Sequence, residues 1–149
     1  MAEADTGLVA AARMTNPIGN RADWEAMRAD VLADPGAFHG NIAARNMHWF
    51  VAGVGESGAW LAKGADGAWH GWDAATCEAV SPDLPADFAP WDAAFDGSNP
   101  PHWRWFVGGR TNAAFSEMDR HVLSGHGEEA ALIFEGDRWD MSALGGKGA

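Results

Sequence analysis

The sequence predicts a small single domain of the α+β class, with two to three helices, short antiparallel hairpins and a proline-rich strap. Its 149 residues suit one domain. A helical apolar period near the start gives way to an aromatic pattern in the middle, and five prolines between 82 and 101 forbid long regular elements there. We expect a mobile lead-in over 1–18, the domain over 19–142 and a flexible glycine-rich tail over 143–149.

Two consecutive helices are expected first. The run RADWEAMRADVLAD, residues 21–34, follows the capping residue Asn20. The run PGAFHGNIAAR, residues 35–45, restarts at Asp34-Pro35, a capping residue followed by proline in the first turn. Helical spacing places one apolar face on the first helix (Trp24, Met27, Val31, Leu32) and an inward face on the second (Phe38, Ile42 and the stem of Arg45).

The middle of the chain repeats a three-residue motif that ends in tryptophan. Gly58-Ala59-Trp60 recurs as Gly67-Ala68-Trp69, with a glycine-containing turn between them. This pattern predicts a β-hairpin whose turn glycines can take positive φ. The stretch 81–101 is then expected to run as an extended strap on the surface, held by three aromatic residues: Phe88, Trp91 and Phe95.

The last third is expected to hold a strand, a helix and a hairpin. Residues 103–107 alternate as a short strand does, and Gly108-Gly109 makes the exit turn. Asn112 can cap a helix over 113–123 with Phe115, Met118 and Val122 on its apolar side, ended by Gly125 or Gly127. The run from 129 to 142 reads as two strands around residues 135–138, which would leave an open sheet edge ready to pair with a further strand.

The net charge of the chain argues against two classes of binding partner. Ten basic residues against 21 acidic ones give a net charge of −11. Residues 51–100 hold eight acidic residues and a single basic one, Lys63. A protein that binds nucleic acid or an anionic membrane needs the opposite sign, so we expect neither partner. The acidic start and the single Cys77 suit a reducing cytoplasm better than secretion.

No catalytic or metal-binding cluster emerges from residue spacing. The six histidines are scattered, and His121 and His126 lack the i, i+4 spacing of a zinc helix. Cys77 has only His70 nearby in the chain and no third group to orient a Cys-His pair. On a helix, the successive residues Asp119, Arg120 and His121 cannot converge on one atom. We therefore expect Asp119 to pair with Arg104 or Arg110 and to serve stability.

The nine tryptophans, with no tyrosine, allow two interpretations. Exposed indole rings stack on sugars, so a carbohydrate-binding module is one. Large aromatic residues also fill the cores of small domains, and the expected helices favour that second interpretation. The solvent exposure of the indole rings separates the two.

Residues 103–140, WRWFVGGRTNAAFSEMDRHVLSGHGEEAALIFEGDRWD, resemble the N-terminal cap region of AMP-forming acetyl- and propionyl-CoA synthetases. The family pattern is a Trp-Phe-x-Gly-Gly-x-x-Asn turn, a helix with Asp-Arg-His, and an apolar strand ending in Glu-Gly-Asp. The run WHGWD looks closest to the ligase part of propionyl-CoA synthase, and the resemblance spans roughly residues 25 to 142. The matching residues are Trp105, Phe106, Gly108, Gly109, Asn112, Asp119, Arg120, His121, Ala131, Leu132, Ile133, Glu135, Gly136 and Asp137.

The sequence departs from that family in two ways. Ser116-Glu117 stand where members often carry Asn-Cys, and the chain ends where the adenylation core is expected to begin. The resemblance therefore transfers no catalytic or cofactor-binding residue to this chain.

The resemblance implies that the complete enzyme uses ATP, Mg and CoA to convert a carboxylate to acyl-CoA, AMP and pyrophosphate. The implied partner is an adenylation core in the same or a separate chain. The sequence is compatible with a fragment, a truncated product, a separate subunit, or a stand-alone regulator that docks on a full-length synthetase.

Overall fold

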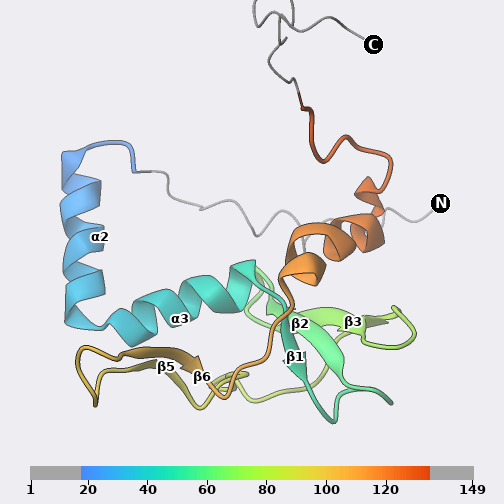
Figure 1. Ribbon diagram of the computed structural model, residues 1–149, viewed down its shortest axis with the longest axis horizontal. Coiled ribbons are helices and arrows are strands. Elements are labelled where there is room, and N and C mark those ends of the chain that lie inside the picture. Colours follow the sequence, from blue (N-terminus) through green and yellow to red (C-terminus); the bar gives the residue numbers. More distant parts are fainter. Residues whose placement is uncertain (1–17, 135–149) are drawn as a thin grey trace, which may run out of the picture.

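The computed structural model describes residues 18–134, and it confirms the α+β class (Figure 1). Two helices and two antiparallel sheets, ordered β1-β2-β3-β4 and β5-β6, precede a final helical segment with two π-helical parts, η1 and η2. The elements are α2 (Arg21–Ala33), α3 (Pro35–Asn46), β1 (Trp49–Val51), β2 (Ala59–Lys63), β3 (Trp69–Asp73), β4 (Ala79–Val80), β5 (Ala93–Asp96), β6 (Arg104–Val107), η1 (Phe115–Asp119) and η2 (Val122–His126). Within this described part, no helix is long and apolar enough to cross a membrane.

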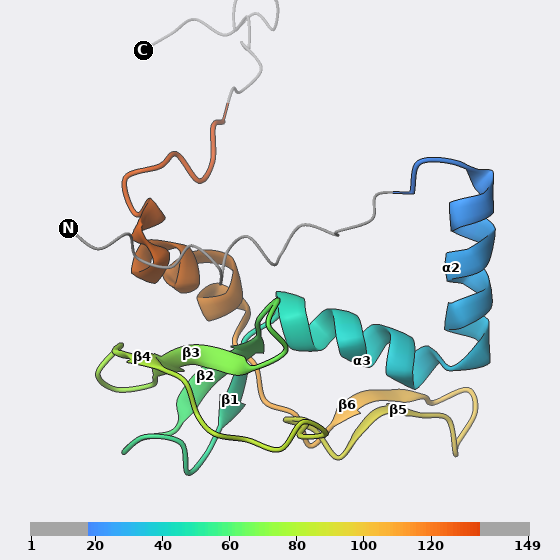
Figure 2. The same ribbon diagram turned by 180° about the vertical axis from the view of Figure 1, so that it is seen from behind.

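Helix α3 is the central element. The β5–β6 hairpin lies along it, the larger sheet lies beyond its C-terminal end, and the η1–η2 segment crosses over that sheet (Figures 1 and 2). Helix α2 stands away from the sheets and meets α3 at a sharp angle. The domain is therefore drawn out, with α2 at one end and η1–η2 at the other.

Both helix starts confirm the expected caps. The Asn20 side chain accepts a hydrogen bond from the Asp23 amide at 3.0 Å, and the Asp34 carboxylate accepts one from the Ala37 amide at 2.8 Å. Each cap satisfies an amide that has no partner inside the helix. Local sequence therefore sets these two boundaries.

The expected inward faces of the two helices need correction. No residue of α2 is fully buried: Met27 and Val31 are half-buried as expected of an inward face, but Trp24 and Leu32 are exposed. On α3, Ile42 and Arg45 are exposed, and the buried residues are Gly40, Ala43 and Ala44. Small side chains line this face because α3 packs closely against β2 and β5, so a bulky inward stripe would not fit.

The predicted hairpin is confirmed as β2–β3. Ala59 pairs with Asp73 and Lys63 with Trp69, and Gly67 has a φ of +84° in the turn. Alternation along these strands gives the sheet two aromatic faces. Trp60 and Trp72 pair directly across the strands and contact Phe115 of η1, whereas the opposite face carries a different set: Trp49, Leu61 and Trp69.

The strap is anchored as expected at two of its three aromatic residues but is less irregular than predicted. Phe88 and Trp91 pack against the core. Phe95 instead lies in β5, which pairs with β6 and places Phe95 4.6 Å from the ring of Trp105. The strand β5 has only four residues. Because prolines stand on both sides of it in the sequence, the residue pattern did not indicate a strand there.

The C-terminal helix starts at the predicted cap but differs in its exposed face. The Asn112 side chain accepts a hydrogen bond from the Ala114 amide at 2.9 Å, and Gly125, with a φ of +90°, breaks the helical course. Phe115 is buried, but Met118 and Val122 are exposed. Residues 131–134 form no strand, and the rest of the expected hairpin, from 135 to 142, lies outside the described residues.

The tryptophans mainly build the core. Trp49, Trp69 and Trp72 are buried, and Trp60 and Trp91 are half-buried. Among the described tryptophans only three are exposed: Trp24, Trp103 and Trp105. This distribution supports the core interpretation over a sugar-stacking surface.

Candidate functional site

The motif residues lie along one connection between the two sheets and the last helical segment. Trp105 and Phe106 are in β6, Gly108 and Gly109 form the turn after it, and Asn112 starts the helix. Asp119, Arg120 and His121 follow at the boundary between η1 and η2. Glu135, Gly136 and Asp137 lie outside the described residues.

The turn packs against Trp49, the first residue of β1. The Phe106 ring lies 5.1 Å from Trp49 and from Trp91, and the Trp49–Trp91 distance is 4.8 Å. Phe106 reaches this cluster with a φ of +50°, an uncommon conformation for a residue with a side chain. Three aromatic rings thus join the β5–β6 hairpin to the larger sheet.

The two glycines of the turn are needed for different reasons. Gly108 has a φ of +78°, and a Cβ there would lie 2.5 Å from a carboxylate oxygen of Asp92. A Cβ on Gly109 would lie 2.8 Å from the Trp49 ring and 3.1 Å from the Phe106 carbonyl oxygen. Gly108 therefore supplies an unusual backbone angle, whereas Gly109 supplies space.

Replacing Gly109 by alanine is expected to lower the free energy of unfolding by about 1–3 kcal/mol, because the added methyl group overpacks the Trp49 ring. The matched control is Gly127→Ala, where the nearest atom to the added Cβ is 3.4 Å away and φ is −63°. Urea unfolding followed by circular dichroism measures both variants. Equal stability of the two would contradict the assigned role of Gly109.

Residues 110–112 tie the same connection to β1. The Phe50 amide donates to the Arg110 carbonyl oxygen at 2.8 Å, and the Thr111 hydroxyl donates to the His48 carbonyl oxygen at 2.8 Å. Trp49 and Thr111 also form an isolated antiparallel bridge. The turn is thus held by backbone hydrogen bonds in addition to aromatic packing.

Arg120 connects the helical segment to the end of α3. Its guanidinium donates from Nη1 to the Asn46 carbonyl oxygen at 3.0 Å and from Nε to His121 at 3.3 Å. Burial lowers the pKa of Arg120, and burial together with the Arg120 charge lowers the pKa of His121. The side chains of Arg120 and His121 therefore turn toward the domain.

Asp119 does not make the expected ion pair. Its side chain is exposed, and among residues 18–134 it has neither a hydrogen bond nor a salt bridge. Arg104 is bound instead by Asp96 across the β5–β6 hairpin, with Nε 3.2 Å from the carboxylate. The prediction that Asp119 serves stability through Arg104 or Arg110 is therefore wrong.

Replacing Arg120 by methionine is expected to lower the free energy of unfolding by about 1–2 kcal/mol, since the Asn46 carbonyl oxygen loses a charged donor. Asp119→Ala is the matched control on the same turn, with an expected change within about 0.5 kcal/mol. Thermal and urea unfolding of the three proteins measure the difference. A larger loss in Asp119→Ala than in Arg120→Met would overturn this assignment.

A buried histidine that the residue spacing did not reveal lies beside this junction. His48 is 1% exposed, and neither ring nitrogen has a hydrogen-bond partner among the described residues. Its ring contacts Trp72 and Phe115, 5.2 and 5.5 Å away. Burial first, and the charges of Arg120 and His121 next, lower the pKa of His48 to about 4. His48 is therefore neutral near pH 7.

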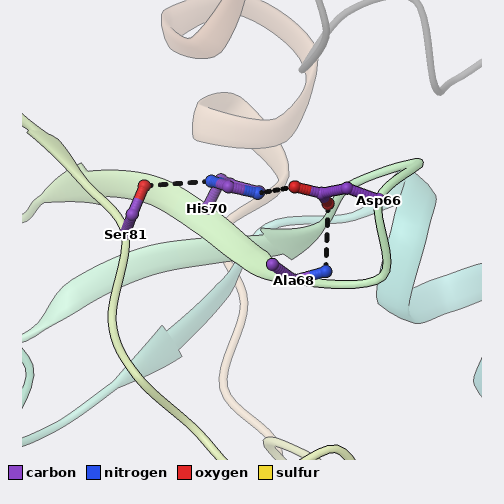
Figure 3. Close-up of polar contacts among 4 residues, drawn as sticks. All are labelled: Asp66, Ala68, His70 and Ser81. Atoms are coloured by element: carbon purple, nitrogen blue, oxygen red, sulfur yellow. Dashed lines mark hydrogen bonds and ion pairs between the residues drawn. The ribbon is translucent and has the colours of Figure 1, made fainter.

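A second histidine joins a serine and an aspartate. His70 Nδ1 lies 3.0 Å from the Ser81 hydroxyl, His70 Nε2 lies 2.8 Å from the Asp66 carboxylate, and Asp66 also accepts from the Ala68 amide (Figure 3). This is the order of a nucleophile, a base and an orienting acid. Ser81 and Asp66 are exposed, however, and neither they nor His70 line a described hollow. The contacts fasten the β2–β3 turn to the start of the strap.

The remaining candidate reactive side chains do not form a common site among the described residues. Both ring nitrogens of His70 are engaged by Asp66 and Ser81, so His70 does not activate Cys77, which is a free, exposed thiol. Over the described range 18–134, no group of three or more His, Cys, Asp or Glu side chains is arranged to hold a metal ion. The described contacts of residues 105–121 are aromatic packing, helix capping and the hydrogen bonds of Arg120.

Comparisons with known proteins identify this region. Residues 87–116 match the family model described as the acetyl-coenzyme A synthetase N-terminus. An acetyl-coenzyme A synthetase of Pyrobaculum arsenaticum is 46% identical over 55 residues, 37% of this chain and 8% of the relative. One from Streptomyces avermitilis is 47% identical over 49 residues, 33% of this chain and 8% of the relative. The match thus spans less than a tenth of either relative. Part of this chain is therefore similar to the N-terminal region of acetyl-coenzyme A synthetases.

Proposed function

We propose that the domain acts as a structural cap that packs on the adenylation core of an AMP-forming acyl-CoA synthetase. The observation that carries the proposal is where the family match falls. It runs from Asp87 in the strap through the Phe106–Gly109 turn to Ser116, the part that joins both sheets to the last helical segment. The region that matches the family model thus includes the connection from which η1 and η2 leave the domain.

The surface proposed to meet the core is the exposed apolar side of that segment. Met118 and Val122 project from it, and Leu132, Ile133 and Phe134 beyond η2 are almost fully exposed. Apolar groups gathered at one end of a small domain mark a contact surface. The carboxylates of Glu117 and Asp119 border Met118 in the chain, so a partner with basic residues around an apolar strip would fit.

The described residues do not fit ATP, Mg or CoA. They present no cluster of carboxylates for Mg, and a hollow of about 460 Å³ is lined mainly by Ala, Gly and aromatic residues of α3 and the strap. We assign the binding of these groups, and the conversion of a carboxylate to its CoA thioester, to the core. This domain would hold the core in shape and take no part in proton or phosphoryl transfer.

The substrate we propose for the complete enzyme is a short-chain carboxylate, because the relatives are named for acetyl-coenzyme A. The likeness to propionyl-CoA synthase stays a prediction. A cytoplasmic location also stays a prediction, supported by the exposed free thiol of Cys77.

The proposal is tested by co-expressing this chain with the acetyl-coenzyme A synthetase of Pyrobaculum arsenaticum from which its own N-terminal region has been deleted. We expect co-purification, at least a tenfold loss of it in Met118→Asp/Val122→Asp, and no loss in Trp103→Asp, whose exposed side chain lies just before β6. Failure to form a complex, or equal loss in both variants, contradicts the proposed docking surface. Calorimetric binding of MgATP or CoA by this chain alone would contradict the structural role.

A further inference from the structure

The hollow of about 460 Å³ lies between helix α3, strand β5 and the strap, and it is also lined by Lys63 and Trp69 of the larger sheet. None of the described residues that line it belongs to η1 or η2. Its volume is typical of sites that bind small molecules. On the α3 side the lining runs from Gly36 to Ala44, about 12 Å along the helix axis. The hollow is therefore long enough for an extended ligand.

Much of the wall of this hollow is apolar. Phe88 and Trp91 of the strap and Phe95 of β5 line it, and all three side chains are half-buried. A Cβ on Gly40 would lie 3.2 Å from the Cβ of Ala94, so α3 and β5 are in close contact beside the hollow. Small side chains on α3 thus leave room for the apolar part of a ligand against aromatic rings.

Two neighbouring hydrogen-bond donors in the lining lack a strong acceptor. Lys63 and Trp69 pair directly across β2 and β3, which places their side chains next to each other on one face of the sheet. Lys63 Nζ lies 3.4 Å from the Ala86 carbonyl oxygen and forms no salt bridge with any residue from 18 to 134. Trp69 is 3% exposed, and its buried indole N–H has no acceptor among the same residues. Buried donors in folded proteins normally have a partner, so this pair indicates where an acceptor from outside would bind.

We propose that the hollow binds a straight-chain carboxylate. The carboxylate accepts hydrogen bonds from the Lys63 ammonium group and the Trp69 indole N–H, and the alkyl chain lies between α3 and the aromatic rings of the strap. A carboxylate is favoured over a neutral acceptor because its hydrogen bond with an ammonium group is charge-assisted. The site is independent of the proposed docking of η1 and η2 on a core, because it uses none of their residues.

Titration of the full chain with octanoate, followed by NMR of the indole N–H groups and by calorimetry, tests the proposal. The Trp69 indole resonance, assigned with a Trp69→Phe variant, is expected to shift as octanoate binds. Octylammonium, which has the same chain length and the opposite charge, is expected to bind about tenfold more weakly. Absence of binding, equal affinity for the two compounds, or saturation by octanoate without a shift of the Trp69 resonance would each overturn the proposal.

Matched variants locate the head group and the chain. Lys63→Met is expected to weaken octanoate binding about tenfold, whereas Arg45→Met, the same change of charge at an exposed position of α3 outside the hollow, leaves it unchanged. Ala37→Trp fills the α3 side of the hollow from an exposed position and is expected to weaken octanoate more than butyrate. Equal effects of Lys63→Met and Arg45→Met would refute the assigned role of Lys63, and equal weakening of both acids by Ala37→Trp would refute the placement of the chain.

Asp87 provides a further check on the charge of the ligand. It is the acidic residue among those described in the lining, it is exposed, and it forms no salt bridge with Lys63. Its charge opposes an anionic ligand and favours a cationic one, so Asp87→Asn is expected to tighten octanoate binding about twofold. Weaker octanoate binding in this variant would contradict the proposed carboxylate.

Discussion

Replacing Trp49 by alanine is expected to lower the free energy of unfolding by about 3–5 kcal/mol, the cost of removing a large aromatic side chain from a packed core. Trp49 is 2% exposed and contacts both Trp91 of the strap and Phe106 of β6. Its indole N–H donates to the Ala43 carbonyl oxygen at 3.0 Å. One side chain therefore joins α3, the larger sheet and the β5–β6 hairpin. A small domain is marginally stable, so we expect a largely unfolded variant at 37 °C.

Trp103→Ala is the matched control, because this tryptophan is 58% exposed and its loss leaves no cavity. Its expected effect is within about 0.5 kcal/mol. Trp49→Phe should fall between the two, since the smaller ring keeps part of the packing but not the hydrogen bond. Urea unfolding by circular dichroism orders the three variants. A Trp49→Ala protein as stable as Trp103→Ala would show that the aromatic cluster does not hold the two sheets together.

The parts of the fold that local chemistry determines could be predicted from the sequence. Three helices begin at a capping residue whose side chain accepts a hydrogen bond from an amide two or three residues later: Asn20, Asp34 and Asn112. Such a contact joins residues that are close in the sequence. The β2–β3 hairpin is equally local, with its turn between two aromatic strands. These boundaries needed no knowledge of distant neighbours.

The faces of the helices could not be predicted in the same way. A helical period shows which side chains align but not how far a neighbour covers them: on α2, Met27 and Val31 are half-buried, whereas Trp24 and Leu32 stay exposed. On the last helical segment, the π-helical parts widen the turn. Residues three and four positions apart then rotate off a common side, so Met118 and Val122 do not follow Phe115 into the core.

The junction at residues 105–121 was only partly predictable. The Gly-Gly turn and the Asn112 cap are visible in the sequence, but Trp49, which packs on the turn, and Asn46, which binds Arg120, come from a segment about sixty or more residues earlier. Only one weak feature of the sequence indicates that His48 is buried: it lies between Met47 and Trp49, at the start of an apolar strand. Its complete burial depends on Phe115 and Ser116, which contact it from η1.

Stability is expected to fall by about 3 kcal/mol as the pH is lowered from 6.5 to 4, and His48 is the residue responsible. Its pKa is about 4 in the folded protein against 6.5 in the unfolded chain, a difference worth about 3 kcal/mol. Between these two values the unfolded chain binds a proton that the folded protein does not, so acid favours unfolding. Below pH 4 both states are protonated and His48 adds no further slope.

His48→Phe should flatten that decline, because it removes the titrating group and the two ring nitrogens that lack partners while keeping an aromatic ring against Trp72 and Phe115. The carboxylates of Asp66 and Asp73, whose pKa values are lowered by backbone hydrogen bonds first of all, lose their contribution below the window of His48. His102→Gln is the control, because the side chain of His102 is exposed and is not among the groups that lower the pKa of His48. Urea unfolding at pH 7, 6, 5 and 4 measures the slopes. A wild-type slope retained in His48→Phe would place the acid sensitivity elsewhere, and an NMR titration showing His48 protonated at pH 6 in the folded protein would remove its cause.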